Sequence, residues 1–415
     1  MTHIHEALGS FLDNDLYKFT MQNAVLKNYK DVPVVYHFIN RKQNAFKLNK
    51  DAVQWIKKQI QAMEDLYITE DELAYMAAFP FFDTAYIDYL SHFRYRPSEQ
   101  IKIKFDEETS DLDLEIVGSW PETILYETPL LALISEAYFK FVDKDWIDDN
   151  QYERARSKAS TLLEDGCQFF EFGTRRRRSL SVQDCVMRAF TDMKQEYINE
   201  CQDKGTKALG DAAGTSNVYL AKKYNFNAVG TVAHEFFMGI SALEGLKNVN
   251  KKALEVWTQT YNGALAIALT DTFTTPIFLK DFQHTLASDF TGVRHDSGDP
   301  EEFAKTIVNH YKSLGIEPST KKIVFSDGLD VDRATSLHKL CDDLNIQSSF
   351  GIGTHFSNDF EKASDPKNKS KSMSIVIKLK ECNGIRVIKL SDDVSKHSGN
   401  QSLVDSLEKE LGIVH

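Results

Sequence analysis

The sequence predicts an α/β protein in two parts: an α/β barrel of parallel strands, and a mixed α+β domain that both ends of the chain build together. Three observations lead to this prediction. The chain has 415 residues, more than one ordinary hydrophobic core accommodates. Between Gln168 and Thr354, short apolar strands alternate with amphipathic stretches of helical length. Outside that block the alternation stops. We place the barrel at residues 136–369, and the second domain at residues 1–135, completed by 370–415.

Seven short apolar stretches are the expected barrel strands. They are Gln168–Phe172, a weaker one near Ala208–Ala213, Ala228–Val232, Leu265–Leu269, Phe290–Val293, Lys322–Phe325 and Ser348–Gly351. Helical patterns such as Lys251–Tyr261, Glu301–Leu314 and Val331–Leu344 lie between them. This alternation predicts parallel strands with crossover helices, and six or seven units in a row favour a barrel over an open sheet.

The two ends of the chain are expected to share one sheet. The N-terminal part has helical patterns at Tyr17–Tyr29, Asp51–Met63, Glu70–Ala77 and Thr84–His92, with strands near Val32–Asn40 and Gln100–Val117. Near the C-terminus, Met373–Leu379 and Arg386–Leu390 flank Asn383-Gly384, a strong hairpin signal. Because a hairpin is marginally stable alone, we expect it to complete the N-terminal sheet. The lysine-rich stretch Glu361–Lys371 is interpreted as a solvated linker.

Composition excludes several classes of protein. The net charge of −12 and the lack of a long basic tract argue against a nucleic-acid surface. The best apolar run, Pro129–Val142, is interrupted by polar residues and is too short to span a bilayer. Five scattered cysteines without a CxxC pattern suggest neither a zinc site nor disulfides. With no signal peptide in the N-terminal sequence, we expect a cytosolic protein, with the nucleus as a second location.

Each expected strand is followed by polar, chemically useful residues. The run GVRHDSGDP at Gly292–Pro300 is the most informative, because it places an arginine and two carboxylates after a short apolar stretch. The βα turns of a barrel carry catalytic groups, and acidic oxygens beside a guanidinium suit sugar hydroxyls, Mg²⁺ and phosphate. The alternative is a plain helix start, since Asp299 and Pro300 make a good N-cap.

Two further turns have the character of phosphate and ribose sites. GIGT at Gly351–Thr354 lets backbone N–H groups approach an anion and adds a hydroxyl. SDGLD at Ser326–Asp330 places Asp327 where it can accept hydrogen bonds from ribose. A glycine turn without ligand, and a helix capped by Asp330, are the alternative interpretations.

Two further runs add charged and ionisable groups at the carboxyl ends of the expected strands. They are EFGTRRRRS at Glu171–Ser179, with four arginines, and GTVAHE, with an imidazole. At most two of the four arginines can reach one ligand, and Arg175 is the best candidate. Phe172 offers a flat face to an aromatic ring. His234 also follows a strand, and Asp271 in LTDT is expected to orient its imidazole by a hydrogen bond.

Together these segments resemble the nicotinate phosphoribosyltransferase family, with the likeness strongest to its fungal form. The resemblance begins with SFLDNDLYKFTMQNAV at Ser10–Val25, and ends with IVIKL at Ile375–Leu379 and IKLSD at Ile388–Asp392. Between them stand EFGTRRRRS, GTSN, GTVAHE, LTDT, RHDSGDP, SDGLD and FGIGT. The resemblance implies a type II phosphoribosyltransferase, which is an irregular α/β barrel with a mixed α+β domain.

The resemblance implies an ATP-dependent ligase of NAD salvage. Such an enzyme joins nicotinate to phosphoribosyl pyrophosphate, forming nicotinate mononucleotide and pyrophosphate, with Mg²⁺ as cofactor and ATP as co-substrate. It also implies a homodimer with shared active sites, in which the Tyr-Lys pair at Tyr17 and the Arg41 side chain reach into the partner's site. His234 matches the position that ATP phosphorylates in this family.

The motifs and the resemblance together give a set of expected site residues. Those expected to take part in catalysis are His234, Asp271, Asp296 and Arg175; those to contact nicotinate are Tyr17, Phe172, Arg175, Ser216 and Arg294. Those to hold the phosphoribosyl group and its phosphates are Arg41, Asp296, Ser297, Asp299, Ser326, Asp327, Gly328, Gly353 and Thr354. No metal ligand is assigned firmly, although Asp296 and Asp299 are candidates for contacts to Mg²⁺.

The residue expected to select the substrate is Ser216, in GTSN. The resemblance implies that relatives using nicotinamide have an aspartate there, which would repel the carboxylate of nicotinate. Neutral Ser216, with Arg175 and Arg294 near, suits the acid. One departure from the family is the weak strand KALGDAA before GTSN, which predicts a short or bulged strand.

Other functions remain open at the level of the sequence. Quinolinate and nicotinamide phosphoribosyltransferases share the barrel and the phosphoribosyl donor, and a catalytically inactive scaffold of the same fold is a further alternative. An unrelated barrel hydrolase using Asp296 and Asp327 would leave the phosphate-binding glycines unexplained.

Overall fold

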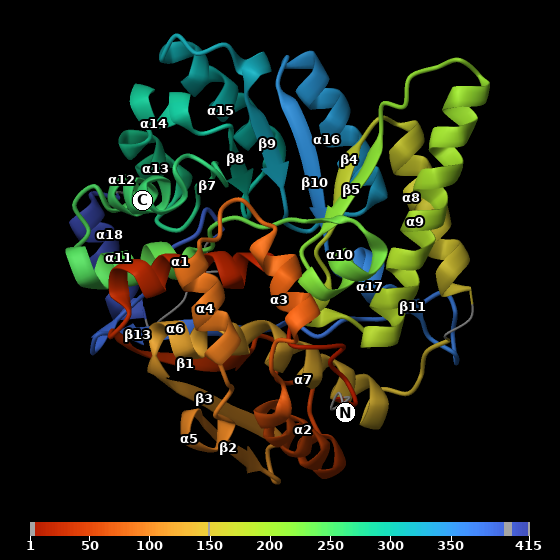
Figure 1. Cartoon of the computed structure of the whole chain (residues 1–415), viewed down its shortest axis with the longest axis vertical. Helices are drawn as coiled ribbons and strands as arrows, with labels where there is room; N and C mark the ends of the chain where they lie inside the picture. Colours follow the sequence, from red (N-terminus) through yellow and green to blue (C-terminus); the bar gives the residue numbers. More distant parts are fainter. Residues whose placement is uncertain (1–4, 148–149, 394–400, 414–415) are drawn as a thin grey trace.

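The structure is a computed structural model, and it describes residues 5–147, 150–393 and 401–413. Two large sheets organise it (Figure 1). The parallel sheet has the order β6-β5-β4-β10-β9-β8-β7, made of β4 (Gln168–Glu171), β5 (Asp211–Thr215), β6 (Asn227–Ala228), β7 (Ile267–Leu269), β8 (Gly292–His295), β9 (Lys322–Phe325) and β10 (Gln347–Ile352). The antiparallel sheet has the order β14-β13-β1-β3-β2, made of β1 (Pro33–Asn40), β2 (Ile101–Asp106), β3 (Asp111–Ser119), β13 (Ile375–Cys382) and β14 (Ile385–Arg386).

The parallel sheet confirms the predicted irregular barrel. Its strands follow one another in cyclic order, except that β6 and β7 do not pair in the part of the chain that the structure describes. The barrel is therefore open on one side. The strand before GTSN is short, and its pairing with β4 shifts register between Phe169 and Phe170. The weakly apolar run KALGDAA predicted such a short or bulged strand. The point of the arrows in Figure 1 shows that β8, β9 and β10 all end toward the middle of the molecule.

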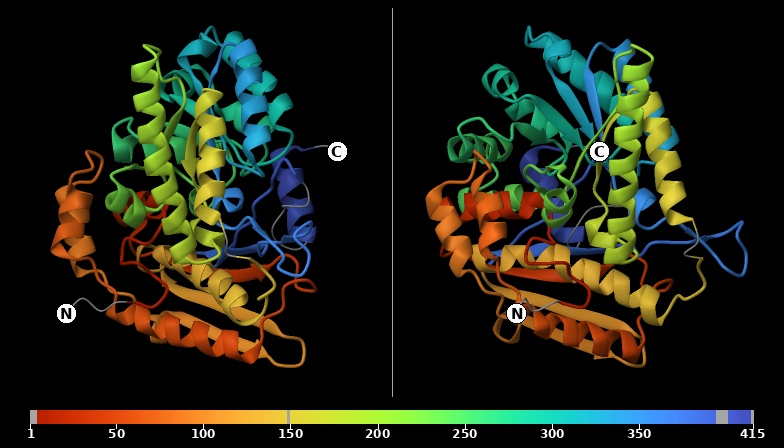
Figure 2. Two further views of the ribbon diagram at one scale, coloured as in Figure 1. Left: turned by 90° about the vertical axis from the view of Figure 1, so that its right-hand side faces the viewer. Right: turned by 45° about the vertical axis from the view of Figure 1, so that its right-hand side comes forward.

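Helices alternate with the strands of the barrel along the chain. They are α8 (Gln151–Glu164), α9 (Leu180–Asp203), α10 (Val218–Tyr224), α11 (His234–Glu244), α12 (Val249–Tyr261), α13 (Thr275–Asp281), α14 (His284–Asp289), α15 (Pro300–Ser313), α16 (Val331–Asp343) and α17 (Thr354–Ser357). The long helices α8 and α9 lie side by side along one flank (Figure 2). None of the helices in the described ranges combines the length and the apolar character that a membrane span requires.

The helices of the other part lie around the antiparallel sheet and against the barrel. They are α1 (Leu16–Tyr29), α2 (Lys50–Ala62), α3 (Glu70–Ala77), α4 (Thr84–His92), α5 (Pro97–Gln100), α6 (Trp120–Thr123), α7 (Glu127–Phe141) and α18 (Gln401–Leu411). The expected linker instead contains a small two-stranded pair, β11 (Phe360–Glu361) with β12 (Lys369–Ser370).

The predicted C-terminal hairpin joins the N-terminal sheet. Strand β13 pairs antiparallel with β1 over seven residue pairs, and β1 also pairs with β3. Asn383 and Gly384 have φ values of 53° and 75°, the left-handed conformation that a two-residue hairpin turn needs. The second strand is shorter than expected, because the chain leaves the sheet after Arg386.

Helix α1 packs beside the open side of the barrel. The backbone N–H of Leu16 donates to the carbonyl of Ser216 after β5 at 2.8 Å. After β6, a Cβ at Gly230 would lie 2.7 Å from the backbone nitrogen of Tyr17, so only glycine allows this approach. On the other side, the Tyr261 hydroxyl at the end of α12 donates to the carbonyl of Thr20. The N-terminal helix is thereby fixed against its own chain's barrel.

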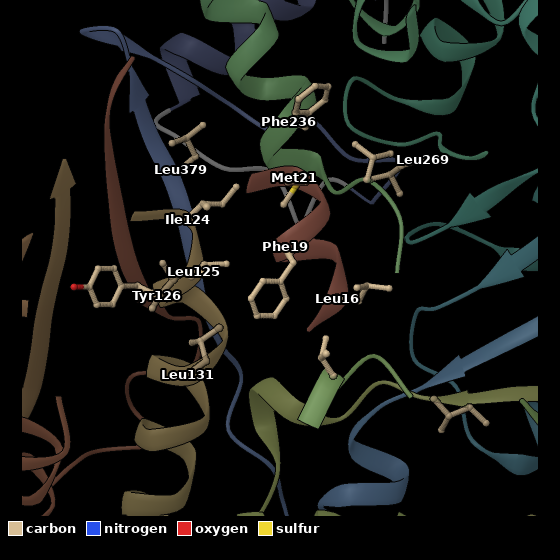
Figure 3. Packing of buried hydrophobic residues seen from close by; sticks show 14 of the residues in the cluster. Leu16, Phe19, Met21, Ile124, Leu125, Tyr126, Leu131, Phe236, Leu269 and Leu379 are labelled. Atoms are coloured by element: carbon tan, nitrogen blue, oxygen red, sulfur yellow. The ribbon is translucent and has the colours of Figure 1, made fainter. Parts of the chain in front are cut away.

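One continuous hydrophobic core joins the two sheets. Figure 3 shows α1 in its centre, with Phe19 and Met21 between the segment around Leu125 and the helix that carries Phe236. Because α1 contributes to both halves, burial of its apolar side chains also fixes the position of the barrel relative to the antiparallel sheet.

Candidate active site

A cavity of about 730 Å³ lies at the carboxyl ends of the parallel strands, against β13 of the antiparallel sheet. Most of the predicted site residues line it: Tyr17, Arg41, Phe172, Arg175, His234, Arg294, Asp296, Ser326, Asp327, Gly328, Gly353 and Thr354. Ser216, Asp271, Ser297 and Asp299 do not belong to this lining. The strand ends therefore converge on one cavity, as the sequence predicted.

His234 is the first residue of α11 and is held by groups from three segments. Its Nδ1 lies 3.0 Å from the Thr272 hydroxyl, and its Nε2 lies 2.8 Å from Asp296 Oδ2. The Lys389 ammonium is 2.9 Å from the same Nε2. The expected direct bond from Asp271 is absent, because the nearest Asp271 oxygen is 3.8 Å from Nε2.

Asp271 acts on the histidine without a direct hydrogen bond. Its Oδ2 accepts a hydrogen bond from the Ser297 hydroxyl at 2.5 Å and lies 3.1 Å from the ammonium of Lys389. Asp271 and Ser297 are both fully buried behind the cavity wall, which explains why neither lines it. Asp271 is thus a supporting residue for Lys389, and it acts on His234 by its charge at 3.8 Å and not by a hydrogen bond.

The local charges favour a neutral imidazole beside an ionised carboxylate. Burial lowers the pKa of His234, and the nearby Lys389 ammonium lowers it further against the opposing effect of Asp271 and Asp296. Burial would raise the pKa of Asp296, but Arg294, His234 and Lys389 together hold it well below its ordinary value. A neutral imidazole has a lone pair available for nucleophilic attack.

Arg294 and Ser326 fix the other oxygen of Asp296. The Nη2 atom of Arg294 donates to Asp296 Oδ1 at 3.0 Å, and its Nε donates to the Ser326 hydroxyl at 2.9 Å. Ser326 in turn lies 2.9 Å from the same oxygen. The ends of β8 and β9 are thereby locked together, so that the carboxylate has one orientation.

The cations of this acidic protein gather on the cavity wall. In addition to the predicted arginines, this wall carries Lys42, Arg176, Lys369, Lys371, Lys378 and Lys389. Burial lowers the pKa of Lys378 to about 8, with Arg41 and Lys389 adding repulsion. A site that crowds positive charge in this way is suited to ligands with several phosphates.

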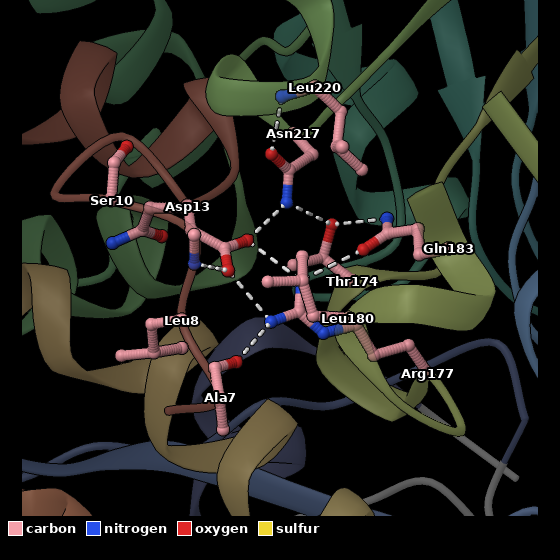
Figure 4. A network of polar contacts seen from close by, with 12 residues as sticks. Ala7, Leu8, Ser10, Asp13, Thr174, Arg177, Leu180, Gln183, Asn217 and Leu220 are labelled. Carbon is pink, nitrogen blue, oxygen red and sulfur yellow. Dashed lines mark hydrogen bonds and ion pairs between the residues drawn. The ribbon is translucent and has the colours of Figure 1, made fainter. Parts of the chain in front are cut away.

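The arginine run Arg175–Arg178 divides into two pairs, as the sequence predicted. Arg175 and Arg176 line the cavity. Arg177 is fully buried and makes two 2.7 Å hydrogen bonds to Asp13, in a network that Figure 4 shows. Arg178 stacks on Phe139, with 3.6 Å between its guanidinium carbon and the ring centre. Arg177 is therefore paired, one of the two outcomes that the sequence suggested for the remaining arginines, while Arg178 is buried against an aromatic ring.

Aromatic rings and a guanidinium form one end of the cavity. Arg175 lies over the ring of Tyr17 at 5.9 Å, and Phe172 lines the same cavity. A Cβ at Gly351 would lie 2.3 Å from the Phe172 ring, so this glycine leaves the space that the ring occupies. The hydroxyl of Tyr17 is buried and has no hydrogen-bond partner among the described residues.

The positions of Tyr17 and Arg41 differ from one expectation. The resemblance implied that both side chains reach into a partner's site, yet both line the cavity of their own chain. For Tyr17 the reason is the docking of α1 beside the open side of the barrel. Arg41 directly follows β1, and the pairing of β1 with β13 places it at the cavity.

Two predicted residues have other surroundings than expected. Ser216 is buried, and its hydroxyl donates to Asp15 Oδ1 at 2.7 Å, one layer behind the cavity wall. Burial raises the pKa of Asp15. Asp299 is exposed and caps α15 by accepting from the N–H groups of Glu301 and Glu302 at 2.8 and 3.1 Å. The structure thus matches the alternative interpretation of this pair, in which Asp299 and Pro300 start a helix.

One of the carboxylates fits a role in holding Mg²⁺. Asp327 borders the cavity, and carboxylate oxygens are the ligands that Mg²⁺ prefers. Asp296 borders it too, but its two oxygens already contact His234, Arg294 and Ser326. Asp299, the other candidate, points away into its helix cap. His234, Asp271 and Asp296 also bring ligand atoms within 4.8 Å of one another, but the Lys389 ammonium contacts that group.

Sequence reasoning missed several residues of the site. Lys389 lies in IKLSD and Lys378 in IVIKL, two segments that were recognised only as part of a resemblance. Glu127 was not singled out, and Lys18 was named only as part of the Tyr-Lys pair that the resemblance implied for a partner's site. A charged residue inside an otherwise apolar helical stretch, such as Lys18 before Phe19, was the available signal.

Comparisons with known proteins agree with this geometry. The model of the nicotinate phosphoribosyltransferase (NAPRTase) family matches residues 167–415, and that of its N-terminal domain matches residues 12–135. The probable nicotinate phosphoribosyltransferase of Schizosaccharomyces pombe is 44% identical over 98% of both chains. The nicotinate phosphoribosyltransferase of Saccharomyces cerevisiae is 43% identical over 98% of this chain and 95% of its own.

Solved structures lead to the same assignment. The crystal structure of a putative nicotinate phosphoribosyltransferase from Saccharomyces cerevisiae superposes with a TM-score of 0.91, at 42% identity over 98% of both chains. That of the Porphyromonas gingivalis enzyme gives a TM-score of 0.87, at 36% identity over 97% of this chain and 99% of its own. The predicted likeness to fungal members is confirmed. The chain belongs to the nicotinate phosphoribosyltransferase family.

Proposed function

We propose that this protein joins nicotinate to phosphoribosyl pyrophosphate, forming nicotinate mononucleotide and pyrophosphate, and couples the reaction to hydrolysis of ATP. The observation that carries the proposal is the cavity in which Arg175, His234 and the turns after β9 and β10 meet. This reaction would be the entry of nicotinate into NAD salvage.

The chemistry requires electrostatic stabilisation more than proton transfer. The pyridine nitrogen of nicotinate has a free lone pair, which attacks the anomeric carbon while the bond from that carbon to the pyrophosphate oxygen breaks. No general base is needed. The ribosyl centre gains positive charge as the bond breaks, and the ionised carboxylate of Asp296 at the cavity wall favours that charge.

The cavity wall offers a distinct place for each part of the substrates. Arg175 would bind the carboxylate of nicotinate, with Tyr17 and Phe172 against the ring. Asp327 would bind ribose hydroxyls, and the turn at Gly353 and Thr354 the 5′-phosphate. The leaving pyrophosphate would lie against the lysines and arginines of the cavity lining. Asp327 would hold Mg²⁺, which would supply further neutralisation of the phosphates.

His234 is the proposed acceptor of the γ-phosphoryl group of ATP. A ring nitrogen would attack the phosphorus with its lone pair, the bond to the oxygen of ADP would break, and ADP would leave. Water then hydrolyses the phosphorus–nitrogen bond. The added charge would reorganise contacts of Lys389 and Arg294 with the neighbouring carboxylates, which links ATP use to substrate binding.

Labelling with γ-³²P-ATP tests this proposal. The protein should acquire acid-labile phosphate, and His234→Ala should acquire none and should no longer couple ATP use to product formation. His310→Ala is the matched control. His310 lies in the last turn of α15, contacts the backbone carbonyl of Phe282 and does not line the cavity. Undiminished labelling of His234→Ala would contradict the assignment.

The choice of base is tested in the same assay. Product formation should depend on nicotinate and should be stimulated by ATP, while quinolinate and nicotinamide should be poor substrates. Release of CO₂ from quinolinate without ATP would instead identify a quinolinate phosphoribosyltransferase. Binding of nicotinate and phosphoribosyl pyrophosphate without any turnover would identify an inactive scaffold.

A further inference from the structure

A chain of four charged residues links Arg175 to the residue that follows His234. Lys18, in α1, is fully buried, and its ammonium lies 2.5 Å from Glu127 Oε2 and 2.5 Å from Glu235 Oε2. Glu127 Oε1 accepts a hydrogen bond from Arg175 at 3.3 Å. Glu235 directly follows His234 in the first turn of α11. The order of the chain is therefore Arg175, Glu127, Lys18, Glu235, and the next residue is His234.

Glu235 is fixed by donors from three other elements. Besides Lys18, the indole N–H of Trp120 donates to Glu235 Oε1 at 2.8 Å, and the Tyr36 hydroxyl donates to it at 2.5 Å. These donors come from α1, α6 and β1. Because Glu235 is the second residue of α11, fixing its carboxylate also fixes the backbone turn that presents His234.

Lys18 also neutralises two carboxylates that face a site for anions. Glu127 and Glu235 both line the cavity. Unpaired, they would repel the carboxylate of nicotinate and the phosphates of ATP. With Lys18 and Arg175, the four charges sum to zero, and Arg175 keeps the rest of its guanidinium for a ligand. Burial alone would lower the pKa of Lys18, but the two carboxylates raise it, so the lysine is charged.

We propose that Lys18 is a positioning residue that holds the nicotinate-binding arginine, through Glu127, and the phosphoryl-accepting histidine, through Glu235, in one rigid unit. The inference rests on the proposed function for the roles of Arg175 and His234. It adds that the buried ammonium of Lys18 serves both the binding of nicotinate and the phosphorylation of His234. A buried ion pair adds little net stability compared with apolar side chains of similar size. A gain in stability alone therefore does not explain why a charged Lys18 is buried at this place.

The two branches give separable effects. Glu127→Gln removes the charge that orients Arg175, so the KM for nicotinate should rise roughly tenfold, while the rate of His234 labelling by ATP stays within about twofold. Glu235→Gln should do the opposite, with labelling roughly tenfold slower and the KM for nicotinate within about twofold. Lys18→Met should impair both, and Lys18→Arg should restore part of each.

A second lysine of the same helix gives the matched control. Lys27 pairs with Asp83 at 2.9 Å on the solvent side of α1, so Lys27→Met makes the same chemical change away from the cavity. It should leave the KM for nicotinate and the labelling rate unchanged. Urea unfolding of each variant separates loss of fold from loss of position. If Lys18→Met does not fold, the two glutamine variants still provide the test.

The outcomes distinguish this inference from the proposed function. An unsubstituted protein that neither labels on His234 nor uses nicotinate overturns the proposed function. With an active parent, Glu127→Gln and Glu235→Gln that change the two parameters in equal proportion overturn the positioning role. A Lys18→Met protein that is less stable but keeps the parental KM for nicotinate and the parental labelling rate also overturns the positioning role.

Discussion

The ammonium of Lys389 lies 2.9 Å from Nε2 of His234, although 155 residues separate them along the chain. The lysine belongs to the segment that leaves the antiparallel sheet after β14, and the histidine is the first residue of α11. Its ammonium also lies 3.1 Å from Asp271 and 3.9 Å from Asp296. The C-terminal part of the chain thus supplies the positive charge that two barrel carboxylates surround.

Replacing Lys389 should impair the proposed phosphorylation of His234 most. In Lys389→Met, the carboxylates of Asp271 and Asp296 lose a nearby cation and repel the γ-phosphate of ATP. We expect the rate of His234 labelling to fall on the order of 10²-fold, the usual effect of removing one fixed electrostatic group from an active site. Rapid-quench labelling with γ-³²P-ATP measures it. Lys380→Met is the control, since Lys380 lies 3.7 Å from Glu115 on the exposed part of the sheet; equal rates for both variants would contradict this role.

Lys378 should make phosphate binding depend on pH. Its pKa is lowered to about 8 by burial and by Arg41 and Lys389, and a bound pyrophosphate group should raise that pKa again because it favours the ammonium. Below pH 8 the lysine is already charged, and binding takes up no proton there. Above pH 8 it is neutral in the empty cavity, so binding takes up a proton and the affinity falls as pH rises.

Calorimetry in buffers of different ionisation enthalpy tests this linkage. Titration with pyrophosphate at pH 8.5 should show net proton uptake that is lost at about pH 6.5, on the acid side of the lowered Lys378 pKa. Lys378→Met should bind more weakly at the lower pH and show no such uptake at the higher one. Proton uptake that persists in Lys378→Met would assign the effect to another group.

Substitution of Ser216 by aspartate should weaken the use of nicotinate. The Ser216 hydroxyl now donates to Asp15, which is itself buried near Arg175. Ser216→Asp would place a second carboxylate against the first and compete for Arg175, so kcat/KM for nicotinate should fall by roughly tenfold or more. Ser216→Ala removes the hydrogen bond without adding charge and should fall less. Parental kcat/KM in the aspartate variant would count against this view.

The sequence predicts the strand ends of this site well, because two local signals coincide there. A short apolar strand followed at once by glycine and charged residues locates the turns at Gly353, Asp327 and Asp296 without any tertiary knowledge. All three turns line the cavity. The order of the parallel strands follows from the same alternation, since crossover connections place consecutive strands side by side.

Side chains that come from outside the barrel could not be predicted in this way. Tyr17 enters its own chain's cavity because Gly230 allows α1 to approach the loop after β6. Lys389 reaches His234 only because β14 ends early and the chain turns inward. Both depend on the packing of the two parts of the molecule, which no local pattern encodes. The same holds for Arg177, since a run of arginines does not show which members find a buried partner.

The ion pair of Arg177 and Asp13 gives the last prediction, which concerns stability. Both side chains are fully buried, and Asp13 also accepts a 2.7 Å hydrogen bond from Asn217 (Figure 4). In Asp13→Ala the guanidinium stays buried without its counter-charge, so the free energy of unfolding should fall by about 3–5 kcal/mol. Urea unfolding followed by tryptophan fluorescence measures this change.

A double variant separates the net contribution of the pair from the cost of leaving one charge alone. Asp13→Leu combined with Arg177→Met removes both charges and fills similar space, so it should be more stable than Asp13→Ala. Glu196→Gln, which breaks an exposed pair with Arg156, should leave the unfolding midpoint unchanged. A double variant as unstable as Asp13→Ala would mean that the pair itself, and not merely charge balance, holds the segment before α1 against the barrel.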